Sequence, residues 1–400
     1  MNETSPAQSI GVPKPLVDGP EKTTGKAMFA ADFQTAETLV GRILRSPVAH
    51  ANIIAMDIAK AEALPGVHAV VTEADCSESY GVLPIAMNEW ALARGRVRYR
   101  GEPVAAVAAI DVATAQRALD LIEVTYEELP AYFTAEAARA EGAVLLHDDK
   151  PGNIERDAEF DLGDVDAELA AADLVREIDV NCAEVCQVQM EPHAAFAEYD
   201  GARERLTIRP STQVPFYVHK MLARTMGMAE GHIRVIKPHI GGGFGSRTET
   251  LQSDLIAGLL ARKARATVKV VLSREETFIT HRGRPESRIK MKVGMKADGT
   301  ITAVDFTVQQ RGGAYSGYGI VTILYSGSMI YGLYNIVSAR FQGVRVLTNT
   351  PPCGAFRGHG TVNVRFAFES LMDEMARDLG LDPFEVRRAN LLKAPTFTLN

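Results

Sequence analysis

The feature that most constrains the fold is a run of glycines between a predicted strand and a predicted helix. Residues 233–240 are apolar enough to form a strand, residues 241–247 read GGGFGSR and are called the glycine loop below, and residues 249–262 have the pattern of a helix. Glycines in this position leave backbone N–H groups free at a helix N-terminus, where they favour an anionic group. A tight strand-to-helix turn that binds nothing is the alternative interpretation.

The glycine loop does not match the two common nucleotide-binding patterns. Ser246 takes the place of the third glycine in a dinucleotide fingerprint, and the loop lacks the Lys-Ser/Thr ending of a P-loop. The net charge of −7 gives no electrostatic reason to expect nucleic acid as a partner. No apolar run reaches about 18 residues, so no membrane span is expected. The polar N-terminus, which lacks an apolar signal segment, indicates the cytoplasm.

The 400 residues are enough for two or three domains at roughly 150 residues each. A nearly continuous apolar run at 104–110 predicts a buried strand, and Asp111 can cap a helix over 112–121. Composition divides the chain into four predicted segments, namely a polar arm over 1–20, a compact α+β unit over 21–133, a surface connection over 134–169 and a larger α/β region over 170–400.

Three further elements are predicted in the last segment. Residues 289–308 alternate as a hairpin that turns at 297–300, because an Asp-Gly pair tolerates the positive φ of such a turn. Thr361 can cap a long amphipathic helix that ends near Leu379, and Asp382 followed by proline begins another helix. These elements, with those above, predict an α+β chain.

Two other motifs could carry chemistry. In residues 349–361, called the arginine loop below, Arg357 stands among small residues just before a predicted helix, which suits an anionic or oxygen-rich ligand. Its alternative role is an ion pair with a nearby carboxylate. In residues 211–215, Gln213 sits in a polar turn between a predicted strand and helix, where its amide can donate a hydrogen bond to a ligand. Most such glutamines are simply solvated.

The three motifs, in this order and spacing, resemble those of the molybdenum hydroxylases, the family of xanthine dehydrogenase and aldehyde oxidoreductase. The family's N-terminal hammerhead domain is resembled by TGKAMFAADF (24–33), GRILRSPVAHANI (41–53) and RGEPVAAVAA (100–109). Its first molybdopterin-binding domain is resembled by MEPHAAFAEYD (190–200), GGGFGSR (241–247) and GAFRGHG (354–360). The resemblance implies an α+β fold in which a hammerhead α/β domain precedes a molybdopterin-binding domain.

The resemblance also implies roles for individual residues. In this family the pterin holds molybdenum without a protein ligand, so no metal ligand is implied and the spacing of Cys182, Cys186 and His193 is interpreted as structural rather than as a zinc site. His359 falls where purine-hydroxylating members place an aromatic side chain that stacks on substrate. The implied cofactor-binding residues are Gln213, Gly243, Phe244, Gly245, Ala355, Phe356 and Arg357. The implied catalytic residues are Tyr325 and Arg357, and the implied substrate pocket contains Thr248, Tyr325 and His359.

Departures from the family pattern narrow the expected substrate. Purine hydroxylases carry glutamate at the position of Thr248 and arginine, on a strand, at that of Tyr325, so xanthine is not expected. Gly358 stands where carbon monoxide dehydrogenase has its copper-binding cysteine. The nearest likeness is the α subunit of 4-hydroxybenzoyl-CoA reductase, matched by residues 81–101, 281–285, 312–327 and 348–362. The expected reaction is therefore reductive removal of a phenolic hydroxyl from an aromatic thioester, with Tyr325 as hydrogen-bond or proton donor.

Two alternatives stay open. One is a hydroxylase of an aldehyde or N-heteroaromatic ring that uses oxygen derived from water, and the other is an inactive cofactor-binding fragment. Residues 394–400 resemble a mid-chain linker, so the second molybdopterin-binding domain and its general-base glutamate are expected either on another chain of a split subunit or in a part lost by truncation. The implied cofactor is molybdenum–molybdopterin, with the cytosine dinucleotide form as one option. The implied partners are that second half, a [2Fe–2S] subunit, an FAD subunit and a small aromatic substrate.

Overall fold

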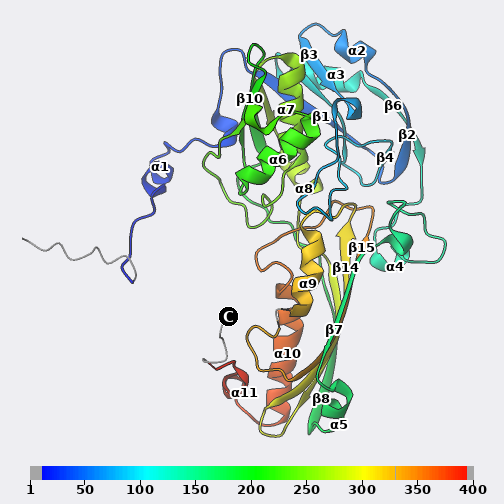
Figure 1. Cartoon of the computed structure of the whole chain (residues 1–400), viewed down its shortest axis with the longest axis vertical. Coiled ribbons are helices and arrows are strands. Elements are labelled where there is room, and N and C mark those ends of the chain that lie inside the picture. Colours follow the sequence, from blue (N-terminus) through cyan, green and yellow to red (C-terminus); the bar gives the residue numbers. More distant parts are fainter. Residues whose placement is uncertain (1–10, 329, 394–400) are drawn as a thin grey trace, which may run out of the picture.

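The protein has two lobes and an N-terminal arm that stands apart from them (Figure 1). The computed structural model describes residues 11–328 and 330–393. The arm was predicted over 1–20; residues 1–10 lie outside the described part, and α1 (Gly19–Thr23) has no buried residue. Among the described residues, no helix has the length and apolar character needed to cross a membrane.

The first lobe (residues 27–131 and 194–279) is built on a seven-stranded sheet. Its order is β11-β10-β9-β12-β1-β5-β3. The strands are β1 (Leu39–Arg45), β3 (Val67–Val71), β5 (Pro103–Ala109), β9 (Ala194–Asp200), β10 (Arg205–Pro210), β11 (Ile233–Val235) and β12 (Val268–Val271). The strand predicted over 233–240 is thus confirmed only in its first three residues, and the predicted buried strand is β5, which is buried throughout.

The seven-stranded sheet joins parts of the chain that were predicted to be separate units. Strand β1 pairs in parallel with β12, with Leu39 opposite Val268, so residues 21–133 and the later region share one sheet and one core. The unit predicted over 21–133 has apolar clusters of its own, but its sheet is continued by strands of the later region. The reason is that β1 lies in the middle of the sheet and needs hydrogen-bonding partners on both sides.

Helices and a small sheet complete the first lobe. Asp111 accepts a hydrogen bond from the Thr114 N–H at 2.7 Å, so the predicted cap of α3 is confirmed. The small sheet has the order β4-β2-β6, with strands Arg96–Val97, Ala51–Asp57 and Glu123–Glu128. The helices are α2 (Ala59–Glu62), α3 (Val112–Asp120), α6 (Pro215–Met226), α7 (Gln252–Ala264) and α8 (Arg274–Ile279).

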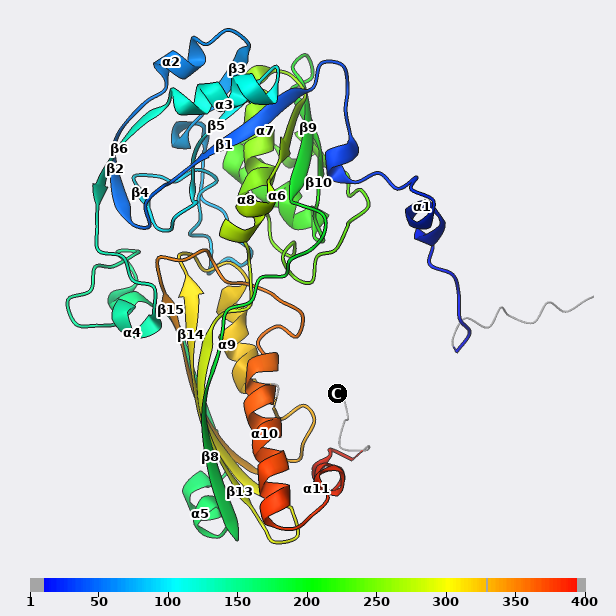
Figure 2. The ribbon, with the colours of Figure 1, turned by 180° about the vertical axis from the view of Figure 1, so that it is seen from behind.

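The second lobe (residues 135–182 and 287–391) is a long five-stranded sheet with helices on both faces (Figure 2). Its order is β7-β15-β14-β13-β8, and the predicted hairpin is confirmed as β13 and β14, with Gly299 at a φ of 87° in the turn. The strands are β7 (Ile154–Leu162), β8 (Leu174–Cys182), β13 (Ser287–Met295), β14 (Ile301–Gly313) and β15 (Ser338–Leu347). The helices are α4 (Ala135–Ala138), α5 (Val165–Ala170), α9 (Gly319–Ser328), α10 (Val362–Asp378) and α11 (Pro383–Asn390).

The predicted surface connection over 134–169 contains a strand of this sheet. Strand β7 pairs with β15 along its length, and the ring of Phe160 lies 5.4 Å from that of Phe341. The acidic residues of this stretch suggested a surface segment. One of them, Glu155, is instead buried against Arg345, and others lie on the exposed side of the strand.

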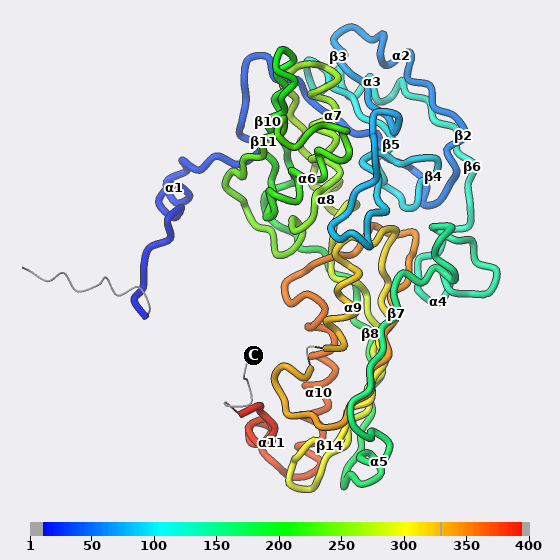
Figure 3. The backbone as a smooth tube through the Cα atoms, viewed as in Figure 1, coloured from blue at the N-terminus to red at the C-terminus, as the bar shows by residue number. Residues whose placement is uncertain are grey.

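The chain crosses between the lobes three times, first after residue 131 and then twice more before it ends in the second lobe (Figure 3). It leaves the second lobe through residues 183–193 and returns through residues 280–286, and an isolated bridge between Val185 and Arg284 joins these two crossings. The arginine loop, which follows β15, also lies at this junction, because Gly354 N–H donates to Gly283 O at 2.9 Å. Loops from both lobes therefore meet in one place.

Arg345 ties the sheet of the second lobe to the arginine loop. Its side chain is fully buried, pairs with the equally buried Glu155, and donates to the carbonyls of Gly312 and Cys353, each at 2.7 Å. We expect Arg345→Met to lower the free energy of unfolding by about 3–5 kcal/mol, because it leaves a buried carboxylate unpaired.

Urea unfolding measures the free energy of unfolding of the wild type, of Arg345→Met and of a surface control variant. Arg176→Met removes a half-exposed pair with Asp378 and should cost about 1 kcal/mol or less. Equal costs for Arg345→Met and Arg176→Met would contradict the structural role given to Arg345.

Candidate functional site

A buried ion pair fixes both ends of the glycine loop. Arg247 is fully buried; its guanidinium pairs with the Glu191 carboxylate and donates to the Glu191 and Pro192 carbonyls at 2.6 and 3.2 Å. The same carboxylate accepts hydrogen bonds from Gly241 N–H at 2.7 Å and from the Ser211 hydroxyl at 2.8 Å. A charge-assisted network of this kind holds its members in one geometry.

Within the loop the backbone takes conformations that favour glycine. Gly242 and Gly245 have φ values of 101° and 111°, and Phe244 is held at 55°, which is uncommon for a residue with a large side chain. A Cβ at Gly245 would overlap the Ala355 carbonyl. The Arg357 N–H donates to Phe244 O at 2.8 Å, so the glycine loop and the arginine loop are in direct contact.

The glycine loop does not open directly onto a helix, which corrects the predicted geometry, whereas the arginine loop leads straight into α10. Helix α7 begins at Gln252, five residues after the glycine loop ends. The chain between the loop and α7 is buried instead, because the Glu249 carboxylate packs against Gly317 and Gly354. Helix α10 is confirmed, but the Thr361 hydroxyl donates to Gly358 O at 2.8 Å and does not cap it.

Gln213 and Thr248 lie against the glycine loop. Gln213 N–H donates to Arg247 O at 3.0 Å, and its exposed side chain occupies the space that a Cβ on Gly243 would need. The Thr248 hydroxyl donates to Gly245 O at 2.8 Å. Both predicted polar residues, Gln213 and Thr248, are thus hydrogen-bonded to the backbone of the glycine loop.

A cavity of about 640 Å³ opens beside these residues, at the junction of the lobes. Four of the predicted site residues line it, namely Gln213, Thr248, Ala355 and His359. The other lining residues are Val214, Pro215, Phe216, Tyr217 and Tyr318. None of these described lining residues is Asp, Glu, Lys or Arg, so the cavity suits a flat, mainly apolar ligand.

Two predicted site residues stand at the margin of the cavity. Tyr325, predicted on a strand, lies on helix α9 with its ring 5.4 Å from that of His359. The helix forms because Ile320 and Ile323 bury one of its faces in the second lobe. Arg357 is exposed, and its carbonyl accepts a hydrogen bond from Arg284 at 2.7 Å.

Phe356 and the Cys182, Cys186 and His193 spacing, which was interpreted as structural, complete the list of anticipated residues. The Arg284 guanidinium lies 4.5 Å from the centre of the Phe356 ring, a cation–π contact that fixes this half-buried side chain. Cys182 ends strand β8, and His193 is buried where the chain enters the first lobe. Among the described residues, no three His, Cys, Asp or Glu side chains are grouped as metal ligands.

Sequence reasoning missed a row of buried charges beneath the cavity. The carboxylate of Glu249 fills the space that a Cβ on Gly317 or Gly354 would need, and burial raises its pKa although Arg282 opposes this. Arg282 in turn donates to Glu89 at 2.5 Å. No local pattern marks Glu249 or Glu89, because their partners come from distant segments. Arg282 stands in the HRGRP stretch, 281–285, which resembled the family without an assigned role.

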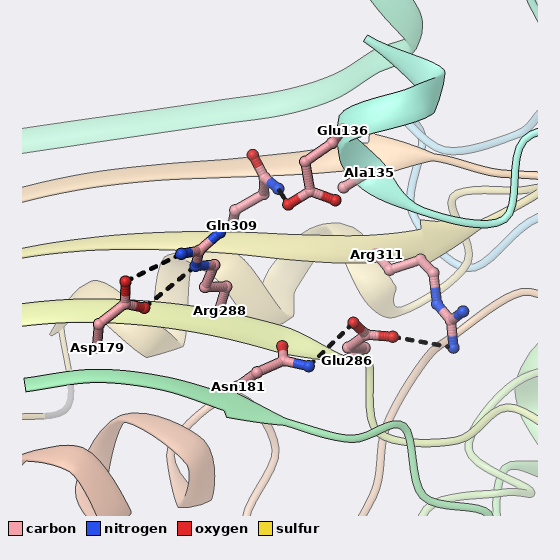
Figure 4. A pocket seen from close by; sticks show the side chains of 8 residues that line it. All are labelled: Ala135, Glu136, Asp179, Asn181, Glu286, Arg288, Gln309 and Arg311. Atoms are coloured by element: carbon pink, nitrogen blue, oxygen red, sulfur yellow. Dashed lines mark hydrogen bonds and ion pairs between the residues drawn. The ribbon is translucent and has the colours of Figure 1, made fainter.

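A second hollow, of about 580 Å³, lies on the outer face of the five-stranded sheet (Figure 4). Its side chains pair with one another: Arg288 with Asp179 at 3.0 Å, and Gln309 with Glu136 at 2.6 Å. It is lined by Ala135, Glu136, Asp179, Asn181, Glu286, Arg288, Gln309 and Arg311. None of the predicted site residues is among them, so the cavity at the lobe junction is the candidate site.

Two protein-family models match the chain in succession. Residues 24–130 match the hammerhead domain of aldehyde oxidase and xanthine dehydrogenase, and residues 146–391 match the molybdopterin cofactor-binding domain. The predicted fold class and the order of the two domains are confirmed. The second match begins inside the predicted connection, at the segment that leads into strand β7.

Individual relatives agree with these matches. The xanthine dehydrogenase molybdenum-binding subunit of Escherichia coli O157:H7 is 32% identical over 94% of this chain and 51% of its own length. The nicotinate dehydrogenase large molybdopterin subunit of Eubacterium barkeri is 34% identical over 96% of this chain and 89% of its own length. The crystal structure of quinoline 2-oxidoreductase from Pseudomonas putida 86 superposes with a TM-score of 0.89 at 32% identity, covering 98% of this chain and 51% of that one. The chain spans about half the length of the first curated relatives it matches.

The contact between the glycine loop and the arginine loop can be tested at Gly245. Gly245→Ala places a methyl group against the Ala355 carbonyl at a φ that L-residues avoid. We expect a loss of about 1–3 kcal/mol in stability and faster hydrogen–deuterium exchange in residues 354–358. Gly231→Ala is the matched control, because nothing lies within 4 Å of its Cβ position. Unchanged exchange in Gly245→Ala would show that the two loops are not coupled.

Buried Asp254, on helix α7, makes the free energy of unfolding depend on pH. Burial raises its pKa to about 7, although the Leu251 N–H and Arg247 oppose the shift. Because the folded-state pKa exceeds the unfolded value, stability is lost as pH rises from about 4 to 7.

We expect Asp254→Asn to remove this loss, since the amide oxygen still accepts from Leu251 N–H. Urea unfolding should show the variant more stable above pH 7 by on the order of 3 kcal/mol, with the difference vanishing below pH 4. A difference that does not vary with pH would contradict the assignment.

Proposed function

The chain belongs to the aldehyde oxidase and xanthine dehydrogenase family of molybdopterin cofactor-binding proteins, and we propose that it is a large molybdopterin subunit that hydroxylates an N-heteroaromatic ring. The observation that carries the proposal is the uncharged, aromatic-lined cavity beside the glycine and arginine loops. A flat ring without net charge fits such a lining. Relatives named for nicotinate and quinoline favour this alternative over the aromatic thioester.

The residues present fit a molybdopterin. Gly243 and Gly245 cannot carry a Cβ without overlapping the Gln213 side chain and the Ala355 carbonyl, so the glycine loop packs closely against the other two motifs. Beside them the Gln213 amide, the Phe244 ring and the Arg357 guanidinium are exposed. We propose that Gln213, Gly243, Phe244, Gly245, Ala355, Phe356 and Arg357 hold the cofactor, with Thr248, Tyr325 and His359 around the substrate.

The bound cofactor would accept two electrons while the substrate carbon exchanges hydrogen for a hydroxyl group from water, with release of two protons. The chain's own residues do the positioning. Gln213 offers an amide N–H toward the cofactor, and Arg357 offers an exposed cation on a backbone that Phe244 and Arg284 hold. Phe216 and Tyr217 form an apolar wall that restricts water and orients the ring.

We propose further chains as partners. A second molybdopterin-binding half would cover the apolar side chains that surround the cavity; Phe216, Phe244 and Tyr325 are 80%, 46% and 42% exposed. A [2Fe–2S] subunit and an FAD subunit would carry the two electrons away. The cytosine dinucleotide form of the pterin and a cytoplasmic location complete the proposal.

Reductive dehydroxylation of 4-hydroxybenzoyl-CoA or a related thioester is the second candidate. The ring of Tyr325 lies 5.4 Å from that of His359, next to the cavity. From there its hydroxyl can donate a hydrogen bond or a proton to the phenolic oxygen of the substrate. This reaction takes up two electrons and two protons and releases water. Tyr325→Phe that leaves thioester turnover unchanged would remove Tyr325 from this role.

The proposed function predicts a loaded complex that labels its product from water. Protein purified from its source should contain about one molybdenum per copy of the chain, with iron and flavin, by elemental analysis and native mass spectrometry. N-heteroaromatic rings turned over in ¹⁸O-water should gain ¹⁸O, whereas the reductive reaction incorporates none. Gln213→Ala should lower kcat/KM about 10- to 100-fold, and Gln116→Ala, on exposed α3, should not. A lone, metal-free chain would leave only the inactive fragment.

A further inference from the structure

The imidazole of His359 is held at the cavity by two tyrosines. The Tyr318 ring centre lies 5.7 Å from that of His359 at an interplanar angle of 85°, and the Tyr325 ring centre lies 5.4 Å away at 79°. Tyr318 also lines the cavity, while Tyr325 approaches from helix α9. Edge-to-face contacts of this kind fix the tilt of the imidazole ring.

Both ring nitrogens of His359 are buried and lack hydrogen-bond partners among the described residues. A neutral imidazole has one N–H donor and one acceptor, and leaving either unsatisfied in a buried site costs free energy. Burial, and secondarily the charge of Arg345, lowers the pKa of His359 to about 4, so the ring is neutral at physiological pH. His359 therefore has unused capacity both to donate and to accept.

Three neighbouring hydroxyl groups are already engaged. The hydroxyls of Tyr217 and Tyr318 are hydrogen-bonded to each other, and the Thr248 hydroxyl donates to Gly245 O. The glutamate that purine-hydroxylating relatives would present to substrate is absent, because that position is Thr248. With the Gln213 amide assigned to the cofactor, His359 is the lining side chain that offers a polar atom on a bound ring both a donor and an acceptor.

We propose that His359 is a specificity-determining residue that hydrogen-bonds the ring nitrogen of an uncharged, flat heteroaromatic substrate. The inference rests on the proposed function and assigns its selectivity to one side chain. It differs from the stacking role that the family resemblance suggested for this position. Because a neutral imidazole both donates and accepts, it can serve a pyridine-type nitrogen in the substrate and the N–H of a lactam formed by hydroxylation beside it.

Nicotinamide and benzamide test this hydrogen bond, because they share shape and charge and differ in one ring nitrogen. Their dissociation constants are measured by titration calorimetry on the complete complex, without turnover. The wild type should bind nicotinamide about tenfold more tightly than benzamide, the worth of one hydrogen bond. His359→Phe keeps an aromatic ring but should bring the ratio to about one. His68→Phe, on the exposed edge strand β3, should leave it at about ten.

His359→Asn keeps a donor and an acceptor without the ring and should retain a few-fold preference, which covers the case in which the Phe variant fails to fold. A His359→Phe variant that keeps the wild-type ratio, or a wild type with equal affinities, would overturn the proposal. The molybdenum content of the same samples separates this outcome from failure of the proposed function. A metal-free complex would contradict the proposed function, whereas the binding ratio would still test the role of His359.

Discussion

The pairing of Glu191 with Arg247 is the interaction on which the site depends. It joins the end of the segment that enters the first lobe to the end of the glycine loop, and the same carboxylate holds Gly241 and Ser211. Three segments of the chain are thereby fixed relative to one another. A buried charge pair is costly to desolvate, and the hydrogen bonds to its remaining polar atoms offset that cost. These bonds fix the backbone of the glycine loop, so its exposed side keeps one geometry.

Buried ion pairs also hold the loops in place at the junction of the two lobes. Glu89 from the first lobe, Arg282 from the returning segment and Glu249 after the glycine loop form a buried row, and Arg345 with Glu155 fixes the arginine loop from the other side. Charges are thus concentrated beneath the cavity and excluded from its lining. That division explains how a site rich in nearby ions can present an uncharged surface to an aromatic ring. It also gives His359 its importance, because few polar groups on the lining are left without partners.

The sequence alone indicated much of this. The buried strand β5, the cap at Asp111, the hairpin β13–β14 and helices α10 and α11 follow from local apolar periodicity and turn chemistry, which act over a few residues. The glycine loop, the arginine loop and Gln213 were found by motif, and the structure brings them together. Their roles toward a cofactor stay predictions. The local rules failed for β7, whose acidic residues suggested surface, for the start of α7 and for the side-chain cap of α10.

Those failures share a cause. Whether Glu155, Arg247 or Glu249 is buried depends on a partner more than 50 residues away for the first two, and on two glycines in other loops for the third. No local pattern encodes that distance. The sequence determined the elements and the family of the chain, because these follow from periodicity and motif. Only the tertiary structure decided that the first and last regions share one sheet and that the cavity is uncharged. It also decided that His359 has unpaired nitrogens, since these properties arise where distant segments exclude water together.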